Sequence, residues 1–127
     1  MLRNLGRFCT VRIVLTALLL STSTIAMAQQ GGRHQDLLRK AIEATARGEC
    51  PGELMTPLLV SACEDQQPRM GQRITNLGNI KSFKFMGVQT SQMGPAEVYR
   101  VSHERGTMTW MINTDSQGQI LVFWTPG

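Results

Sequence analysis

This 127-residue chain contains no catalytic or ligand-binding motif that rises above background. The two histidines are His34 and His103. We expect His34 in an exposed position at the start of a helix, and His103 at the end of a strand, beside a turn. A general base needs a positioned partner and a pocket, and the sequence assigns neither to these residues. We therefore predict no catalytic histidine.

Glu97 and the single tyrosine, Tyr99, form a second candidate group. Residues two apart in a strand point to the same face of a sheet, so their side chains are predicted to lie together. Acidic side chains are seldom fully buried, and we expect Glu97 to be solvated at the end of its strand. The two residues are kept as candidates for binding.

Three aromatic residues, Trp110, Phe123 and Trp124, form the third group of candidates. They are suited to an apolar ligand pocket or to an interface, where aromatic residues are enriched, although most such residues in a small domain form its core. The methionines are scattered, without the close and repeated spacing of a copper site. We predict neither a metal ion nor a cofactor.

Cys50 and Cys63 are predicted to form a structural disulfide. Cys9 lies in a segment that we expect to be removed on export, which leaves these two cysteines, and such a pair in an exported domain usually forms a disulfide. Their spacing does not fit a redox CxxC motif, and no cluster of His or Cys residues completes a zinc site. The predicted role of the bridge is therefore architectural.

Residues 1–28 have the features of a secretory signal peptide. Arginines precede an apolar stretch over residues 13–26, and the alanines at positions 26 and 28 suit cleavage before Gln29. The alternative is an uncleaved anchor helix, but the apolar run is short for a span of about 20 residues. We expect an exported protein, periplasmic or secreted, without a membrane span after cleavage.

The positive charge of the chain comes largely from this leader. The chain has 13 basic and 9 acidic residues, a net charge of +4. Three of the arginines precede the predicted cleavage site, so residues 29–127 keep 10 basic and 9 acidic residues, a net charge of +1. Nucleic-acid binding needs a clustered basic face, so we do not expect nucleic acid as a partner.

Residues 29–127 are predicted to form a single α+β domain, with its helices before its strands. Apolar residues at helical spacing predict three helices, at residues 33–47, 57–66 and 68–77. Thr56 is suited to cap the second helix, with Pro57 at its first position. Pro68 is expected to separate the second helix from the third, because proline removes a helical hydrogen bond.

The second half of the chain is predicted to be a four-stranded antiparallel meander. Its strands are predicted at residues 80–89, 96–103, 107–114 and 119–125. The connections are too short for parallel crossovers, and Gly87 is expected to mark a bulge. The last strand is apolar on both faces. Because helices cover only one face, we expect a partner, a second subunit or a curled sheet edge on the other.

The same half of the chain resembles the exported NTF2-like (cystatin-like, SnoaL-like) group of small domains. The similar segments are Leu77–Gly87, Val98–Val101, Gly106–Ile112 and Asp115–Ile120, within residues 68–125. The resemblance implies a curved sheet wrapped around the N-terminal helix as a cone. Such cones serve as pockets for small molecules, as enzymes, or as dimerisation and accessory modules, so the fold does not select the function.

From these features we expect a non-catalytic binding or accessory protein of the cell envelope, with an envelope protein or a second copy of the chain (a homodimer) as its partner. The alternative is a pocket protein for a small apolar ligand. The third hypothesis is an isomerase-type or hydrolase-type enzyme that uses Glu97 and Tyr99. It requires the Glu97 carboxylate inside an enclosed cavity, within hydrogen-bond reach of Tyr99, as the resemblance to the NTF2-like group implies.

Overall fold

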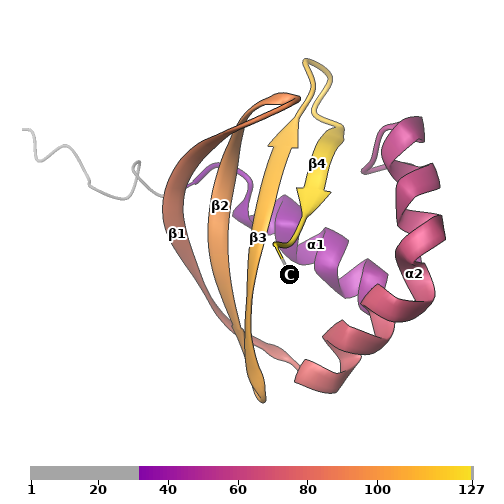
Figure 1. The fold of residues 1–127 in the computed structure, drawn as a ribbon, viewed down its shortest axis with the longest axis vertical. Helices are drawn as coiled ribbons and strands as arrows, with labels where there is room; N and C mark the ends of the chain where they lie inside the picture. Colours follow the sequence, from indigo (N-terminus) through magenta and orange to yellow (C-terminus); the bar gives the residue numbers. More distant parts are fainter. Residues whose placement is uncertain (1–31, 127) are drawn as a thin grey trace, which may run out of the picture.

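The computed structural model describes residues 32–126, so the predicted signal peptide lies outside the described residues. Two helices precede a four-stranded antiparallel sheet of order β1-β2-β3-β4, which confirms the α+β class and the meander (Figure 1). The elements are α1 Gln35–Ala46, α2 Pro57–Leu77, β1 Ile80–Ser91, β2 Gly94–His103, β3 Gly106–Thr114 and β4 Ile120–Trp124.

The hydrophobic core lies between α1 and one face of the sheet, which we call the inner face. Leu38, Ala41 and Ile42 of α1 are fully buried, because their spacing puts them on one side of the helix. On the sheet, the residues of the inner face alternate with outward-facing ones along β2 and β3. The buried residues of this face are Tyr99, Val101, Met108, Trp110 and Ile112.

The prediction of two helices between residues 57 and 77 is wrong, because α2 is one helix of 21 residues with Pro68 inside it. Thr56 caps its start, accepting the Leu59 N–H at 3.4 Å, as predicted. Pro68 has no N–H to donate to the carbonyl of Glu64, four residues earlier, so one helical hydrogen bond is missing. Both residues are exposed to solvent. Contacts with α1 on both sides of the proline keep the helix continuous.

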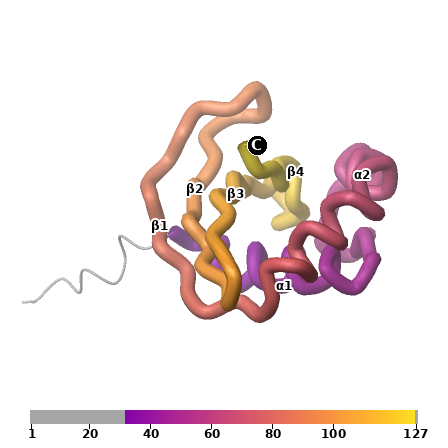
Figure 2. Tube along the Cα trace, turned by 60° about the horizontal axis from the view of Figure 1, so that its bottom comes forward, coloured from indigo at the N-terminus to yellow at the C-terminus, as the bar shows by residue number. Residues whose placement is uncertain are grey.

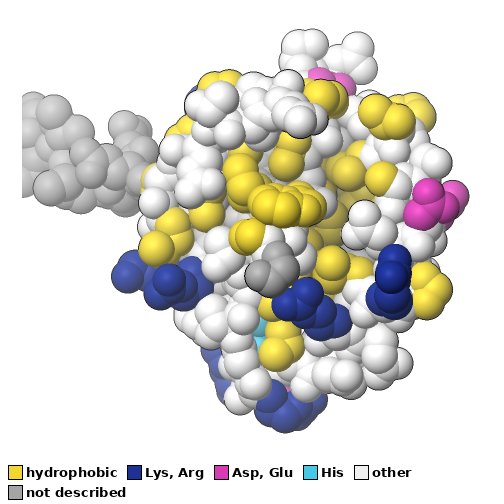
Figure 3. Space-filling view, viewed as in Figure 1, with side chains coloured by type: hydrophobic (Ala, Val, Ile, Leu, Met, Phe, Trp, Pro, Cys, Tyr) yellow, Lys and Arg dark blue, Asp and Glu magenta, His cyan; other side chains and the backbone are white. Residues whose placement is uncertain are grey.

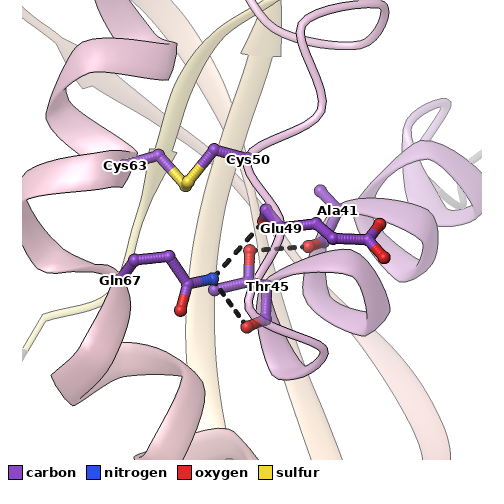
Figure 4. Close-up of a disulfide and its surroundings, with 6 residues drawn as sticks. All are labelled: Ala41, Thr45, Glu49, Cys50, Cys63 and Gln67. Carbon is purple, nitrogen blue, oxygen red and sulfur yellow. Dashed lines mark hydrogen bonds between the residues drawn. A yellow bond between two sulfur atoms is a disulfide. The ribbon is translucent and has the colours of Figure 1, made fainter.

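Those contacts join α1 and α2 side by side (Figure 4). The Cys50–Cys63 disulfide is present, with its Cα atoms 5.9 Å apart, which confirms the prediction. One turn further on, Gln67 Nε2 donates to the Thr45 carbonyl oxygen at 2.8 Å. Gly71 is buried against the same carbonyl, and a Cβ there would lie 2.8 Å from that oxygen. A larger residue at position 71 would therefore push α2 away from the end of α1.

The other face of the sheet, the outer face, is partly covered by the sheet itself. β1 bulges between Phe85 and Gly87, as predicted, and the tip of the β1–β2 hairpin curls over β3 (Figure 2). Asn113 Nδ2 donates to the carbonyl oxygens of Met93 at 3.0 Å and Pro95 at 3.2 Å, which holds the tip in place. The curl buries Ala96, Val98 and Met111 in a second small cluster. A curled edge therefore accounts for part of the outer face.

Candidate functional site

Four side chains meet where the residue before α1 lies against β2 and the end of β3. We call them the polar cluster: His34, Glu97, Tyr99 and Thr114. The Glu97 carboxylate is its centre. Oε1 accepts the Arg33 N–H at 2.9 Å, and Oε2 accepts the His34 N–H at 3.2 Å and the Tyr99 hydroxyl at 2.5 Å. The carboxylate thus binds the backbone that enters α1.

The imidazole of His34 lies between this carboxylate and β3. Its Nδ1 is 2.9 Å from Glu97 Oε1, at an angle that does not make a hydrogen bond, so the contact is electrostatic. Its Nε2 is 3.2 Å from the Thr114 hydroxyl oxygen. The expectation of an exposed His34 is wrong, because these contacts leave its side chain only 24% exposed.

The expectation of a solvated Glu97 is wrong as well. The residue is buried, with 9% of its surface exposed. Burial of a carboxylate is tolerated when donors compensate for the lost water, and Glu97 has three donors and a neighbouring imidazole. Sequence reasoning missed this because the donors at positions 33 and 34 are more than 60 residues away in the chain.

The pKa values of the two acidic groups move apart in this setting. Burial on its own raises the pKa of Glu97, but the hydrogen bonds from Tyr99, Arg33 and His34 and the charge of His34 outweigh it, so the pKa is lowered. Burial raises the pKa of the Tyr99 phenol, and the bond to the Glu97 carboxylate raises it further. The cluster therefore holds an ionised carboxylate and a neutral phenol.

The space over this pair is occupied by the chain itself. Gly32 packs so closely that a Cβ at this position would collide with the Tyr99 hydroxyl and Glu97 Oε2. The enzyme hypothesis requires an acid and a phenol within hydrogen-bond reach inside a cavity. Glu97 and Tyr99 are within hydrogen-bond reach of each other. The carboxylate, however, also accepts hydrogen bonds from backbone N–H groups, and Gly32 packs against it. The arrangement ties residues 32–34 to β2.

His103 is not brought into this cluster. It is the last residue of β2, and Glu97 is six positions away on the same strand, or about 20 Å at strand spacing. Its Nδ1 lies 3.0 Å from the carbonyl oxygen of Gly78, just after α2. It lies at the end of its strand, beside a turn, as predicted, and the residue is buried.

The three candidate aromatic residues divide between two places. Trp110 and Phe123 stack on the inner face, with ring centroids 4.5 Å apart and 10° between the ring planes. Trp110 is 1% exposed and belongs to the core, whereas Trp124 pairs with Met111 in the register of β3 and β4 and is 53% exposed. Among the described residues, the Trp110 indole nitrogen is buried without a hydrogen-bond partner.

A small cavity lies between α2 and β4, beside this stacked pair. We call it the β4 cavity, and its volume is about 90 Å³. Figure 3 shows hydrophobic side chains gathered on this face of the molecule, with Lys and Arg side chains at their lower border. The cavity is lined by Thr45, Leu59, Ala62, Cys63, Gln66, Met70, Trp110, Phe123, Trp124 and Thr125.

A shallow depression on α2 adjoins the cavity and shares Gln66 and Met70 with it. Its other two lining residues are Arg69 and Arg73. Sequence reasoning did not select these arginines, although residues four apart in a helix share one face and that spacing could have identified them. Neither arginine forms an ion pair with another described residue.

Two further properties concern the described residues as a whole. They contain no helix that is long and apolar enough to cross a membrane. Nor do three or more His, Cys, Asp or Glu side chains gather anywhere in residues 32–126 in a way that could hold a metal ion.

Comparison with known proteins does not identify a family for this chain. No protein-family model, no curated protein and no solved structure matches the chain. The function must therefore be argued from the polar cluster, the β4 cavity and the exposed surface around β4.

Proposed function

We propose that this chain is an exported, non-catalytic binding or accessory protein of the cell envelope, which holds a partner protein on an apolar patch around β4. We define this β4 patch as Leu58, Met93, Leu121, Val122 and Trp124. The disulfide and the absence of a spanning helix from residues 32–126 are compatible with export. The proposal includes an NTF2-like fold, which the packing of α1 on one face of a four-stranded antiparallel meander supports.

The observation that carries the proposal is the exposure of large apolar side chains in one place. Leu58 is 75% exposed, Met93 48% and Trp124 53%. Met93 connects them, because it lines one depression with Leu58 and Leu121 and another with Val122 and Trp124. Contiguous apolar patches with aromatic residues and methionine are typical of protein interfaces.

The polar cluster supports the non-catalytic part of the proposal. Its carboxylate already accepts hydrogen bonds from Arg33, His34 and Tyr99, and Gly32 covers it. A general base must reach the proton of a substrate, and here the substrate would first have to displace the start of α1. We therefore assign the polar cluster a structural role.

The test is native mass spectrometry of the unreduced protein, recovered from the exported fraction of its host. We expect either a dimer or a complex with one other protein, together with the loss of the leader. The double variant Met93→Ser/Trp124→Ser should release the partner without unfolding the domain, because both side chains are about half exposed.

The matched control is Val88→Ser on β1, where an apolar side chain of 60% exposure lies outside the patch. It should leave the complex intact. A monomer without any partner, or a complex that survives the double variant, would contradict the proposal.

A further inference from the structure

The two outermost strands of the sheet, β1 and β4, differ in how their free edges are protected. An edge strand carries backbone N–H and C=O groups that can pair with another chain, and native proteins commonly block such an edge with charged side chains. β1 contains Lys81 and Lys84, both exposed, and its register with β2 shifts twice. β4 reads Ile-Leu-Val-Phe-Trp and contains no charged residue. Its edge is therefore chemically suited to pairing with a further strand.

The chain itself already pairs with the first residue of this edge. Met55 forms a parallel bridge with Ile120. The Ile120 N–H donates to the Leu54 carbonyl oxygen at 2.7 Å, and the Ile120 carbonyl oxygen accepts the Thr56 N–H at 3.1 Å. The pairing stops there, because Pro57 begins α2.

The rest of the edge, residues 121–124, is open. Backbone groups of an antiparallel pair point alternately toward and away from the neighbouring strand. Part of the N–H and C=O groups of these residues therefore points away from β3. No residue in the described part of the chain forms a backbone hydrogen bond with them from that side. The edge thus offers donors and acceptors directly after a residue that is already paired in the manner of a strand.

A groove lies beside this open edge. It consists of the β4 cavity and the adjoining depression of about 530 Å³ that contains Leu58 and Leu121. The two share Leu59 and Ala62 of α2, and β4 contributes Phe123 to the cavity. We define the strand groove by Leu59, Ala62, Leu121 and Phe123. None of the described residues that line either hollow is charged, and Figure 3 shows hydrophobic side chains gathered over this region.

We infer that the partner inserts an extended segment between α2 and β4, where the segment pairs with the free edge of β4 as a fifth strand of the sheet. The backbone of the segment supplies the hydrogen bonds, and every second side chain, which is apolar, lies in the strand groove. This inference rests on the proposed function, because it specifies how the partner is held at the β4 patch.

The geometry favours a segment of another protein over a second copy of this chain. In a second copy, α2 and residues 54–56 flank the edge of β4 in the same way. Two such edges would meet with both helices between them. A single extended segment needs only the distance between neighbouring strands, about 4.8 Å. Proline is excluded from its paired positions, because it has no N–H to donate.

The experiment is a titration of the full exported protein, labelled with ¹⁵N, with short synthetic peptides. Three peptides alternate threonine with valine, leucine or phenylalanine, and lysines at both ends keep them soluble. We expect at least one of them to bind. Binding should protect from hydrogen exchange those amides of residues 121–124 that point away from β3, and should leave the amides that point toward β3 unchanged. Contact through side chains alone would not select alternate amides.

Two N-methylated forms of the tightest peptide test the hydrogen bonds. One is methylated at the threonine nitrogens, and the other at the nitrogens of the apolar residues. A strand uses one of its edges to pair with one neighbour, so one form should bind like the parent peptide. The other should bind at least about tenfold more weakly, because it lacks the N–H groups that pair with β4.

Two variants of α2 locate the site. Ala62→Trp places a large side chain in the strand groove and should abolish binding of the peptide. Ser61→Trp, one position away and outside the lining of both hollows, is the matched control and should bind normally. Both positions are exposed, so both variants should fold.

Three results would overturn the inference: no binding by any of the peptides, equal affinity of both N-methylated forms and the parent, or undiminished binding in Ala62→Trp. A homodimer in which the open amides of β4 become protected would also overturn it, because a second copy would then occupy the edge.

The native complex distinguishes this inference from the proposed function. A complex that is lost in Met93→Ser/Trp124→Ser but persists in Ala62→Trp would support the proposed function and refute strand pairing. A protein that binds the peptides as expected, yet is recovered as a monomer without any partner, would support strand pairing and contradict the proposed function.

Discussion

The Glu97 carboxylate of the polar cluster and the Trp110 N–H of the core are both buried, and they differ in whether they have partners. Every close contact of the Glu97 carboxylate is an N–H, an O–H or an imidazole of this chain. The Trp110 N–H has no partner among the described residues. The carboxylate and phenol that were the candidates for chemistry are thus hydrogen-bonded within the chain, whereas a buried donor without a described partner lies in the core.

The largest effect that bears on this comparison is expected at Trp110. Trp110→Ala should lower the free energy of unfolding by about 3–5 kcal/mol, because it leaves a cavity in the core. Trp124→Ala should cost less than about 1 kcal/mol, as expected for a largely exposed side chain. Urea denaturation measures both, and similar losses would contradict the division of the aromatics between core and surface.

The next largest effect is expected from loss of the disulfide, whose Cys63 lines the β4 cavity. The double variant Cys50→Ser/Cys63→Ser should lose about 3 kcal/mol, the chain-entropy cost of a loop of this length. Reduction of the native protein should produce the same fall in melting temperature. An unchanged melting temperature after verified reduction would show that Gln67 and Gly71 suffice to hold the helices together.

Glu97→Gln tests the polar cluster directly. The substitution keeps the shape but removes the charge, and we expect a loss of about 1.5–3 kcal/mol at neutral pH, the range for hydrogen bonds to a charged group. Circular dichroism during urea denaturation is a suitable measurement, with Glu104→Gln at an exposed turn as the control.

The pH dependence of the same variant sharpens this test. The pKa of Glu97 is lowered in the folded state, so the stability due to its charge is fully present above the ordinary pKa of about 4.3. It is lost as the pH falls through the lower value of the folded protein. Glu97→Gln should therefore lose less stability on acidification than the native chain. Parallel acid profiles would argue that the cluster contributes no charge-dependent stability.

The smallest effect is expected at the edge of the cluster. Thr114→Val removes the contact to His34 Nε2 and should cost about 0.5–1.5 kcal/mol, the range for an ordinary hydrogen bond. Thr109→Val, on the outer side of β3, is the matched control. If Thr114→Val matched Glu97→Gln in cost, the imidazole would be the centre of the cluster in place of the carboxylate.

Local chemistry made much of the fold predictable. Short connections indicated antiparallel strands, Gly87 marked the bulge, and the two cysteines that remain after the predicted cleavage indicated a bridge. The continuity of α2 was not predictable from Pro68, because the contacts that override the proline are made by α1. Helix propensity describes a segment on its own, whereas the packing of α1 against α2 determines that this helix continues through Pro68.

The candidate site was less accessible to sequence reasoning. Glu97 and Tyr99 were placed together through the alternation of a strand, but their burial depends on Arg33 and His34, which no local pattern connects to them. The position of the β4 cavity likewise depends on how α2 lies against β4. Long-range pairing of this kind leaves no periodic signal in a single sequence.

The separation between Glu97 and its backbone donors also has a consequence for the order of assembly. The bond from Arg33 to Glu97 spans 64 positions, whereas the bonded cysteines are only 13 apart. Contacts close in sequence form early, and those that close long loops form late. A chain that folds in this order can therefore pair α1 with α2 and bring its cysteines together while the sheet is still incomplete. The start of α1 becomes fixed only once β2 has joined, so the segment that comes first in the sequence is among the last to settle.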